Sequence, residues 1–232
     1  MVAEYLTARI RSIEPGLVQI IKLELERGVL RFAAGQYLNV VHPDGERIPF
    51  SIATPPSRLP QLELHFQPTP GHPQSALMED ALKGDSLRIE GPFGGTVLDK
   101  AKHTSLLFVC AGSGVAQALS MIESVPDESN RNFEIKVLWC CENVSATYVL
   151  KRFQALGAEV SKNLCVDPVR NSGSAGFRQL RHLVVSTSPF DAFLCGSPGF
   201  VWAVTDVLIG LGCSASNLHS DVYDYAPRGG SN

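Results

Sequence analysis

The first hundred residues contain short segments in which apolar and polar side chains alternate. The alternation is clear at residues 18–25 and 62–66 and weaker at 37–41, and Pro and Gly occur between these segments. Because successive side chains of a strand point to opposite faces, this alternation is typical of a sheet with one buried face. We therefore expect short antiparallel strands joined by turns.

One helix and one closing strand are also expected in this region. Residues 75–83 have a helical pattern, with Ser75 suited to the N-cap and Gly84 to the C-terminal end. Residues 85–89 predict a closing strand, and the Gly-Pro-Phe-Gly-Gly sequence at 91–95 predicts a rigid turn. The first domain is therefore expected to end near residue 98.

The pattern changes from residue 104 onward, where apolar strand-like runs alternate with helical segments. Strands are expected at 105–110, 134–139, 164–166 and 192–195, and helices at 115–125, 146–156, 176–184 and 200–211. Alternating strands and helices predict a parallel sheet covered on both faces, which is a doubly wound α/β domain. Residues 171–174 are expected to form a loop and residues 227–232 a frayed tail.

Composition narrows the class of protein. The chain has 232 residues, 44% of them hydrophobic and 19% charged, and a net charge of −3. Without a cluster of Lys or Arg it has no footprint for nucleic acid or for an anionic membrane surface. No apolar run approaches about 18 residues and no signal-like segment opens the chain, so we expect a cytoplasmic protein.

The six cysteines stand at positions 110, 140, 141, 165, 195 and 213. They form neither a C-x-x-C pair nor a ferredoxin cluster spacing, so we expect no metal site. Three of them, Cys110, Cys140 and Cys141, lie in apolar runs and are interpreted as small buried hydrophobes.

The strongest candidate for chemistry is the sequence Gly112-Ser113-Gly114, between an apolar strand and a helix. Glycines let the backbone approach a ligand closely, and a helix start presents free N–H groups to a phosphate. Such a turn also occurs for packing alone, so the motif by itself leaves both interpretations open.

Three segments, in order, resemble motifs of the ferredoxin–NADP reductase superfamily over nearly the whole chain. They are Ile48-Pro49-Phe50-Ser51, Cys110-Ala111-Gly112-Ser113-Gly114 and Cys195-Gly196-Ser197-Pro198-Gly199-Phe200. The length and the segment 48–53 look closest to bacterial NAD(P)H:flavin oxidoreductases of the Fre and LuxG type. The resemblance implies a six-stranded antiparallel β-barrel that binds flavin at 1–98 and a nucleotide-binding α/β domain at 103–232.

In the first domain, the resemblance implies that Ser51 faces flavin N5, although this serine also suits a plain strand surface. The family arginine is replaced by Ile48, and the adjacent Arg47 would point to the opposite face unless a bulge re-aims it. The lost guanidinium favours weak flavin binding. For His65 and His72, ordinary strand and loop positions compete with flavin contact. The candidate flavin-binding residues are Arg47, Pro49, Phe50, Ser51, His65, Phe66, Gly71, Gln74 and Ser75.

In the second domain, the resemblance places Cys195 beside nicotinamide C4, with a buried structural thiol as the alternative. It also implies that residues 220–225 form a C-terminal strand, with Asp221 and Tyr223 or Tyr225 near the flavin; an edge strand capped by aromatic residues is the alternative. The catalytic candidates are Ser51, Cys195 and Asp221. The candidates for binding in this domain are Gly112, Ser113, Gly114, Glu142, Cys195, Gly196, Ser197, Pro198, Phe200, Tyr223 and Tyr225.

Glu142 bears on the choice of nucleotide. A carboxylate three residues after an expected strand can accept hydrogen bonds from ribose hydroxyls and would repel a 2′-phosphate. This residue therefore favours NADH over NADPH, unless it is simply a solvated loop carboxylate.

Together these features predict hydride transfer from NADH to flavin N5, with FAD, FMN or riboflavin bound weakly as substrate. One alternative is a reductase component that holds FAD and passes electrons to a separate ferredoxin or oxygenase. Another is a flavin- or nucleotide-binding regulatory protein with weak turnover, suggested by Ile48 and Ala111. The expected partners are a flavin and a pyridine nucleotide, joined in the reductase-component alternative by a protein electron acceptor, with neither nucleic acid nor membrane.

Overall fold

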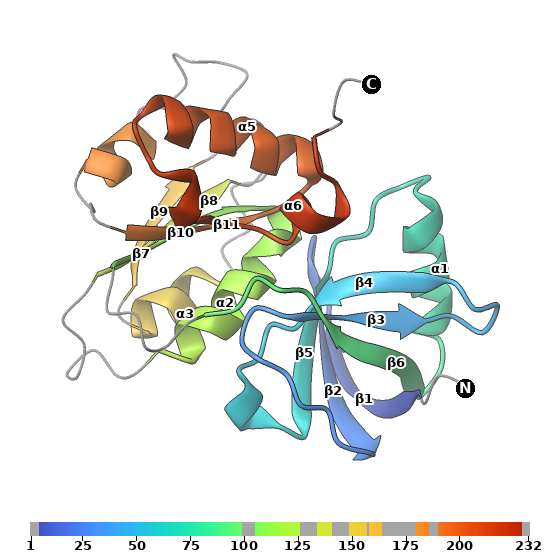
Figure 1. Cartoon of the computed structure of the whole chain (residues 1–232). Coiled ribbons are helices and arrows are strands. Elements are labelled where there is room, and N and C mark those ends of the chain that lie inside the picture. Colours follow the sequence, from blue (N-terminus) through green and yellow to red (C-terminus); the bar gives the residue numbers. More distant parts are fainter. Residues whose placement is uncertain are drawn as a thin grey trace. The chain divides into compact units, whose positions relative to one another are not determined.

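The computed structural model describes residues 5–98, 105–125, 134–140, 149–156, 158–163, 180–185 and 190–228 (Figure 1). The chain divides into two compact units. The first comprises Met1–Leu98 with Leu119–Ser124, and the second comprises Asp99–Ala118 with Val125–Asn232.

The first unit is built on a six-stranded antiparallel sheet, which confirms the fold expected there. Its order is β4-β3-β6-β1-β2-β5. The backbone N–H of Ala53, just after β4, donates to the carbonyl of Glu63 in β5 at 2.9 Å, so the two ends of this order are joined. The strands are β1 (Leu6–Glu14), β2 (Gln19–Arg27), β3 (Tyr37–Val41), β4 (Arg47–Ser51), β5 (Gln61–Phe66) and β6 (Ser86–Phe93).

Two strands of this unit differ from the sequence-based expectation. Strand β1 was not expected, and its pairing with β2 shifts register between Ile10 and Ser12, which interrupts the alternation of apolar residues. Strand β6 continues to Phe93, so the expected turn at 91–95 is wrong over its first three residues. Tyr37 of β3 pairs with Phe93, which keeps this segment extended.

Helix α1 (Pro73–Ala81) begins two residues earlier than expected. His72 is the N-cap and Pro73 occupies the first helical position, where its missing N–H costs no hydrogen bond. Ser75 therefore lies inside the helix, and its hydroxyl accepts a hydrogen bond from the backbone N–H of Thr69 at 3.0 Å. A short 3₁₀ helix, η1, spans Pro56–Arg58.

The second unit holds a five-stranded sheet whose neighbouring strands pair in parallel, as expected for a doubly wound domain. Its order is β11-β10-β7-β8-β9. The strands are β7 (Ser105–Ala111), β8 (Ile135–Cys140), β9 (Glu159–Asn163), β10 (Phe190–Cys195) and β11 (Leu218–His219). The strand expected at 164–166 and the loop at 171–174 lie outside the described residues.

Helices cover both faces of this sheet. Figure 1 shows α5 on one face and α3 with the start of α2 on the other. The helices are α2 (Val115–Glu123), α3 (Leu150–Ala155), α5 (Pro198–Gly210), a helical segment at 180–185, and the 3₁₀ helices η2 (Gly112–Gly114) and η4 (Ala215–Asn217). Among the described helices, none has the length and apolarity needed to span a membrane.

The expected C-terminal strand at 220–225 is wrong, because residues Val222–Tyr225 form a helical turn, α6. The turn is held by local hydrogen bonds, in which the N–H groups of Asp224 and Tyr225 both donate to the carbonyl of Asp221. Tyr223 also bonds to Thr205 of α5, a contact that favours the turn over an extended segment.

Candidate functional site

In the second unit, two turns interlock at the carboxyl edge of the parallel sheet. Cys110 and Cys195 are register partners at the ends of β7 and β10, and each strand leads into a glycine-bearing turn. A Cβ atom on Gly114 would lie 2.7 Å from the carbonyl oxygen of Cys195 and 3.0 Å from the nitrogen of Gly196. No side chain fits at Gly114, so this glycine is required for the close approach of the two backbones.

Ala111 stands where the resembled family has a glycine, and its surroundings accommodate it. A Cβ on Gly196 would lie 3.2 Å from the Cβ of Ala111 and 2.8 Å from a ring carbon of Phe200. The methyl group of Ala111 and the Phe200 ring thus occupy the space that the bare backbone of Gly196 leaves open.

The glycine turn is also fixed by Trp139, which the sequence did not single out. Trp139 is fully buried in β8, and its indole N–H donates to the carbonyl of Gly112 at 3.1 Å. Gly112 has a φ of 52°, a left-handed conformation that favours glycine. A buried tryptophan needs a partner for its N–H, but nothing in the sequence showed that this partner is the turn.

Among the described residues, Cys195 is one of three buried cysteines at the ends of the strands of this sheet. Cys110, Cys140 and Cys195 are at most 3% exposed. Burial raises the pKa of the Cys110 thiol well above its usual value, and a hydrogen bond with Cys195 acts in the same direction. A buried neutral thiol is a poor nucleophile, so this arrangement suits a packing surface more than covalent chemistry.

Helix α5 starts directly after the second turn. Ser197 is its N-cap and accepts a hydrogen bond from the N–H of Phe200 at 3.4 Å, and Pro198 occupies the first position. The positive end of this helix dipole therefore lies at the carboxyl edge of the sheet, where anionic ligands are bound in such folds.

The C-terminal segment is attached to the same edge. The Ser220 hydroxyl donates to the carbonyl of Leu194 at 2.7 Å, beside Cys195. The side-chain amide of Gln117 in α2 donates to Asp221 at 3.0 Å. This places the Asp221 carboxylate between the start of α2 and the end of β10.

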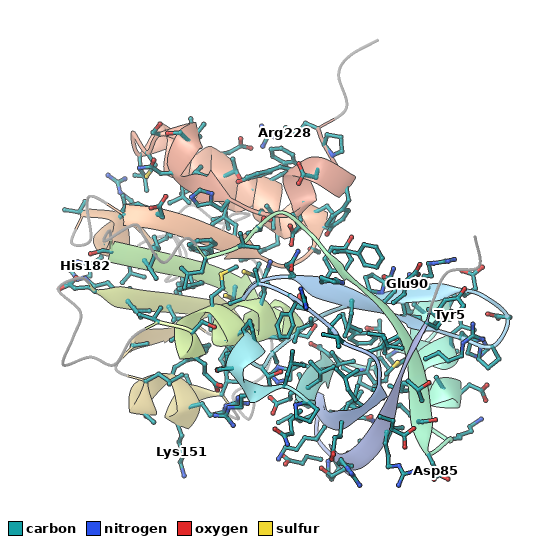
Figure 2. All side chains as sticks on the ribbon, turned by 60° about the horizontal axis from the view of Figure 1, so that its bottom comes forward. Tyr5, Asp85, Glu90, Lys151, His182 and Arg228 are labelled. Atoms are coloured by element: carbon teal, nitrogen blue, oxygen red, sulfur yellow. The ribbon has the colours of Figure 1, made fainter. Side chains whose placement is uncertain are left out.

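The two candidate tyrosines are held differently. Tyr223 is half-buried, shares a 2.8 Å hydrogen bond with Thr205 and packs its ring 4.9 Å from Trp202. Burial raises the pKa of its phenol. Tyr225 is 60% exposed. Arg228, which lies beside α5 in Figure 2, stacks over Trp202 and pairs with Asp206 at 2.6 Å, so the segment is anchored to α5.

In the first unit, β4 sorts the candidate flavin-binding residues onto two faces. The ladder with β3 runs residue for residue from Arg47 to Ser51. Arg47, Pro49 and Ser51 therefore share the outer face, whereas Ile48 and Phe50 belong to the core. Position 48, where the family has arginine, faces the core in this chain.

Phe50 and Phe66, both expected to contact flavin, pack against each other in that core, with ring centroids 6.1 Å apart. The face of Ser51 carries a different aromatic pair. Tyr37 is the direct partner of Ser51 and also pairs with Phe93, and the two rings lie 5.6 Å apart. Alternation at 37–41 could have placed Tyr37 on this face, but its nearness to Ser51 depends on the strand register.

Arg47 is engaged by a carboxylate. Its Nε atom donates to Glu90 of β6 at 2.7 Å, and its side chain remains 49% exposed. This ion pair raises the pKa of the Arg47 guanidinium. Arg47 thus shares a face with Ser51, but a phosphate would have to compete with Glu90.

The remaining candidates of the first unit lie on β5 and at the start of α1. His65 is buried and hydrogen-bonds Glu63 at 2.8 Å. Gly71 and Gln74 are exposed at the start of α1, and Gly71 has a φ of 77°. Glu142 lies outside the described residues. In the described part of the chain, no three His, Cys, Asp or Glu side chains are grouped to hold a metal ion.

Comparison with known proteins shows the same architecture. Residues 108–206 match the family described as "Oxidoreductase NAD-binding domain". The cytochrome P450 reductase GcoB from Amycolatopsis has a similar fold, with a TM-score of 0.80 and 24% identity over 93% of this chain and 68% of that chain.

Two curated relatives are reductase components of oxygenase systems. The terephthalate 1,2-dioxygenase reductase component 1 of Comamonas sp is 28% identical over 91% of this chain and 66% of that protein. The phenol 2-monooxygenase reductase component of Pseudomonas sp. strain CF600 is 30% identical over 77% of this chain and 54% of that protein. The chain thus spans about two thirds or less of the length of these relatives.

Proposed function

Because the chain belongs to the ferredoxin–NADP reductase superfamily of oxidoreductases, we propose that it transfers a hydride from NADH to a flavin. Residues 103–232 would bind the pyridine nucleotide and residues 1–98 the flavin. The observation that carries this proposal is the pair of interlocked turns at the carboxyl edge of the parallel sheet, where Gly114 leaves no space for a side chain.

The second unit supplies the groups that a dinucleotide needs. Backbone N–H groups at the glycine turn and at the start of α5 suit the pyrophosphate. Cys195 supplies a buried thiol beside the turn, which suits a wall against the flat nicotinamide ring. The preference for NADH over NADPH depends on Glu142, whose carboxylate would bind ribose hydroxyls and repel a 2′-phosphate.

The first unit supplies a face for the flavin. The Ser51 hydroxyl can donate a hydrogen bond to flavin N5, and the rings of Tyr37 and Phe93 lie beside it on the same face. Ile48 supplies no guanidinium, and Arg47 is shared with Glu90. We therefore propose that flavin binds weakly and acts as substrate, whether riboflavin, FMN or FAD.

The reaction moves one hydride, a proton with two electrons, from nicotinamide C4 to flavin N5. NADH leaves as NAD⁺, and the reduced flavin takes its second proton from solvent. The role of the chain is to bind the nucleotide and the flavin, and the hydride chemistry itself belongs to the cofactors.

The relatives favour a second candidate within the same family. Both are named as reductase components of oxygenase systems, so the chain could retain FAD and pass electrons to a ferredoxin or an oxygenase. The likeness to flavin reductases of the Fre and LuxG type remains a prediction from the sequence.

Steady-state oxidation of NADH and NADPH with riboflavin, FMN and FAD, together with the absorbance spectrum of the purified protein, separates these functions. A colourless protein that oxidises NADH with free flavin supports the proposal. A yellow protein that needs a protein acceptor supports the second candidate. If neither nucleotide is oxidised with any flavin or protein acceptor, a regulatory binding protein fits better. A strong preference for NADPH would contradict the role of Glu142.

A further inference from the structure

A buried amide on α2, that of Gln117, contacts the carboxylate of Asp221 at the carboxyl edge of the parallel sheet. Gln117 is 6% exposed, and its Nε2 atom donates to Oδ2 of Asp221 at 3.0 Å. The two residues are 104 positions apart in the chain. Burying an amide costs free energy unless the amide is hydrogen-bonded, so the bond from Gln117 to Asp221 offsets part of that cost.

Two hydrogen bonds, one from Gln117 and one from Ser220, attach the segment that carries the Asp221 carboxylate. Gln117 follows Gly114 by three residues, so it belongs to the first turn of α2 after the glycine turn. On the other side, Ser220 donates to the carbonyl of Leu194, the residue before Cys195. Asp221 is therefore held beside the two turns that would enclose a nicotinamide, and Gln117 donates a hydrogen bond to one of its carboxylate oxygens.

A carboxylate in this place affects the two redox forms of the nucleotide differently. The dihydronicotinamide ring of NADH is neutral, whereas the ring of NAD⁺ is a pyridinium cation. A fixed negative charge near the ring stabilises the positive charge that develops as the hydride leaves. The size of this stabilisation depends on where the carboxylate lies, because the attraction between the carboxylate and the ring weakens as the distance between them grows.

We propose that Gln117 is a positioning residue that orients the Asp221 carboxylate toward the nicotinamide ring, so that the site favours the developing pyridinium. This inference rests on the proposed function and deepens it. It assigns Gln117 no direct contact with the reacting atoms. Its effect is therefore expected in the discrimination between NAD⁺ and NADH rather than in overall folding.

The test is the ratio of dissociation constants for NAD⁺ and NADH, measured through the fluorescence of bound NADH, excited directly, and its displacement by NAD⁺. Gln117→Leu keeps the side-chain size and removes the donor. We expect it to weaken NAD⁺ binding about tenfold, the scale of one hydrogen bond to a charged group, with NADH binding nearly unchanged.

Trp202→Phe is the matched control. It removes the indole N–H that donates to the carbonyl of Ala226 at 2.9 Å, so it loosens the same C-terminal segment without touching the carboxylate. We expect it to leave the ratio unchanged. In an Asp221→Asn background, Gln117→Leu should have no further effect, since coupled residues are not additive.

The outcomes separate the two proposals. If the wild-type protein binds neither nucleotide, the proposed function is wrong. If it binds both, but the ratio is the same in Gln117→Leu as in the wild type, or if Gln117→Leu raises the ratio by the same factor in the Asp221→Asn background, only the positioning role is overturned. If Gln117→Leu and Trp202→Phe change the ratio alike, the effect comes from the segment as a whole and the positioning role is likewise overturned.

Discussion

Gly114 of the second unit and Ser51 of the first are placed by different physical means. At Gly114 the backbone of Cys195 stands where a Cβ would lie, so the close packing of two turns fixes the site. At Ser51 there is no such constraint; its neighbours Tyr37 and Phe93 are determined by strand register. A position fixed by steric packing, such as Gly114, accepts almost no other residue. A strand position fixed by register accepts many residues on the exposed face of the sheet and few on the core face.

The core face of β4 offers the largest expected effect. Ile48→Arg restores the arginine of the family pattern, but position 48 is 4% exposed and lies in the core of the first unit. We expect a loss of roughly 3–5 kcal/mol in the free energy of unfolding, because an unpaired charge would be buried.

Urea denaturation measures this change. Glu46→Arg adds the same side chain at an exposed turn position two residues earlier, and we expect it to stay within about 0.5 kcal/mol of the wild type. Tighter flavin binding and unchanged stability in Ile48→Arg would contradict the assignment of faces on β4.

The interlocked turns give the next largest effect. In Gly114→Ala the new methyl group would meet the Cys195 backbone, so the turns must separate. We expect a loss of about 1–3 kcal/mol in stability from overpacking and a clear loss of NADH affinity.

Gly210→Ala serves as the comparison, because a Cβ there meets nothing within 4 Å. Gly210 ends helix α5, and alanine in a helix is favoured by about 0.5–1 kcal/mol. Thermal denaturation and NADH titration compare the two variants. We expect stability to fall in Gly114→Ala and to rise in Gly210→Ala. Equal behaviour of the two variants would mean that the turns are not tightly packed.

A smaller effect tests the outer face of the first unit. Glu90→Gln removes the carboxylate that engages Arg47, so the guanidinium becomes available to a flavin phosphate. We expect the affinity for FMN to rise about threefold, the scale of one exposed ion pair, while the affinity for riboflavin stays the same. Titration of both flavins supplies an internal control, since riboflavin lacks the phosphate. An unchanged FMN-to-riboflavin ratio would exclude Arg47 as a phosphate contact.

The smallest effect is a pH dependence at the turn between β3 and β4. His42 lies between two carboxylates, with its Nδ1 atom 2.8 Å from Asp44 and its Nε2 atom 3.2 Å from Asp80, and the bond to Asp44 is the main cause of its raised pKa. A raised pKa means that the folded state binds the proton more tightly. The stabilisation is therefore fully present below the ordinary value of 6.5 and is lost as pH rises through the folded-state pKa.

His42→Gln is expected to remove this dependence. The difference in urea midpoint between wild type and variant should shrink as pH rises above 6.5. A difference that grows with pH would mean that the neutral imidazole, rather than the charged one, is the stabilising form.

The sequence predicts most of the fold because the buried faces repeat with the period of each element. Strand β3 has the expected bounds, and the helix after Gly114 begins at Val115 as expected. Strand β1 escaped detection because a register shift breaks its alternation. The C-terminal strand was wrong because Tyr223 makes contacts with α5 that no local pattern reveals.

In the candidate site, too, features with a local sequence signal were predictable, whereas contacts between residues distant in the chain were not. The glycine turn and the turn after β10 were predictable, since glycine at strand ends has a local steric signature. The bonds of Trp139 to Gly112 and of Gln117 to Asp221 join residues 27 and 104 positions apart, and only the fold brings them together. Likewise, Phe50 and Phe66 were interpreted as flavin contacts, but the strand register assigns them to the core.

Anaerobic mixing of the protein and flavin with NADH that carries deuterium at C4 tests hydride transfer most directly. We predict that flavin absorbance bleaches in a single phase, more slowly with the deuterated nucleotide than with ordinary NADH, and that Ser51→Ala slows this phase. Bleaching that requires no protein, or no bleaching with riboflavin, FMN or FAD, would contradict hydride transfer from NADH to a flavin by this chain.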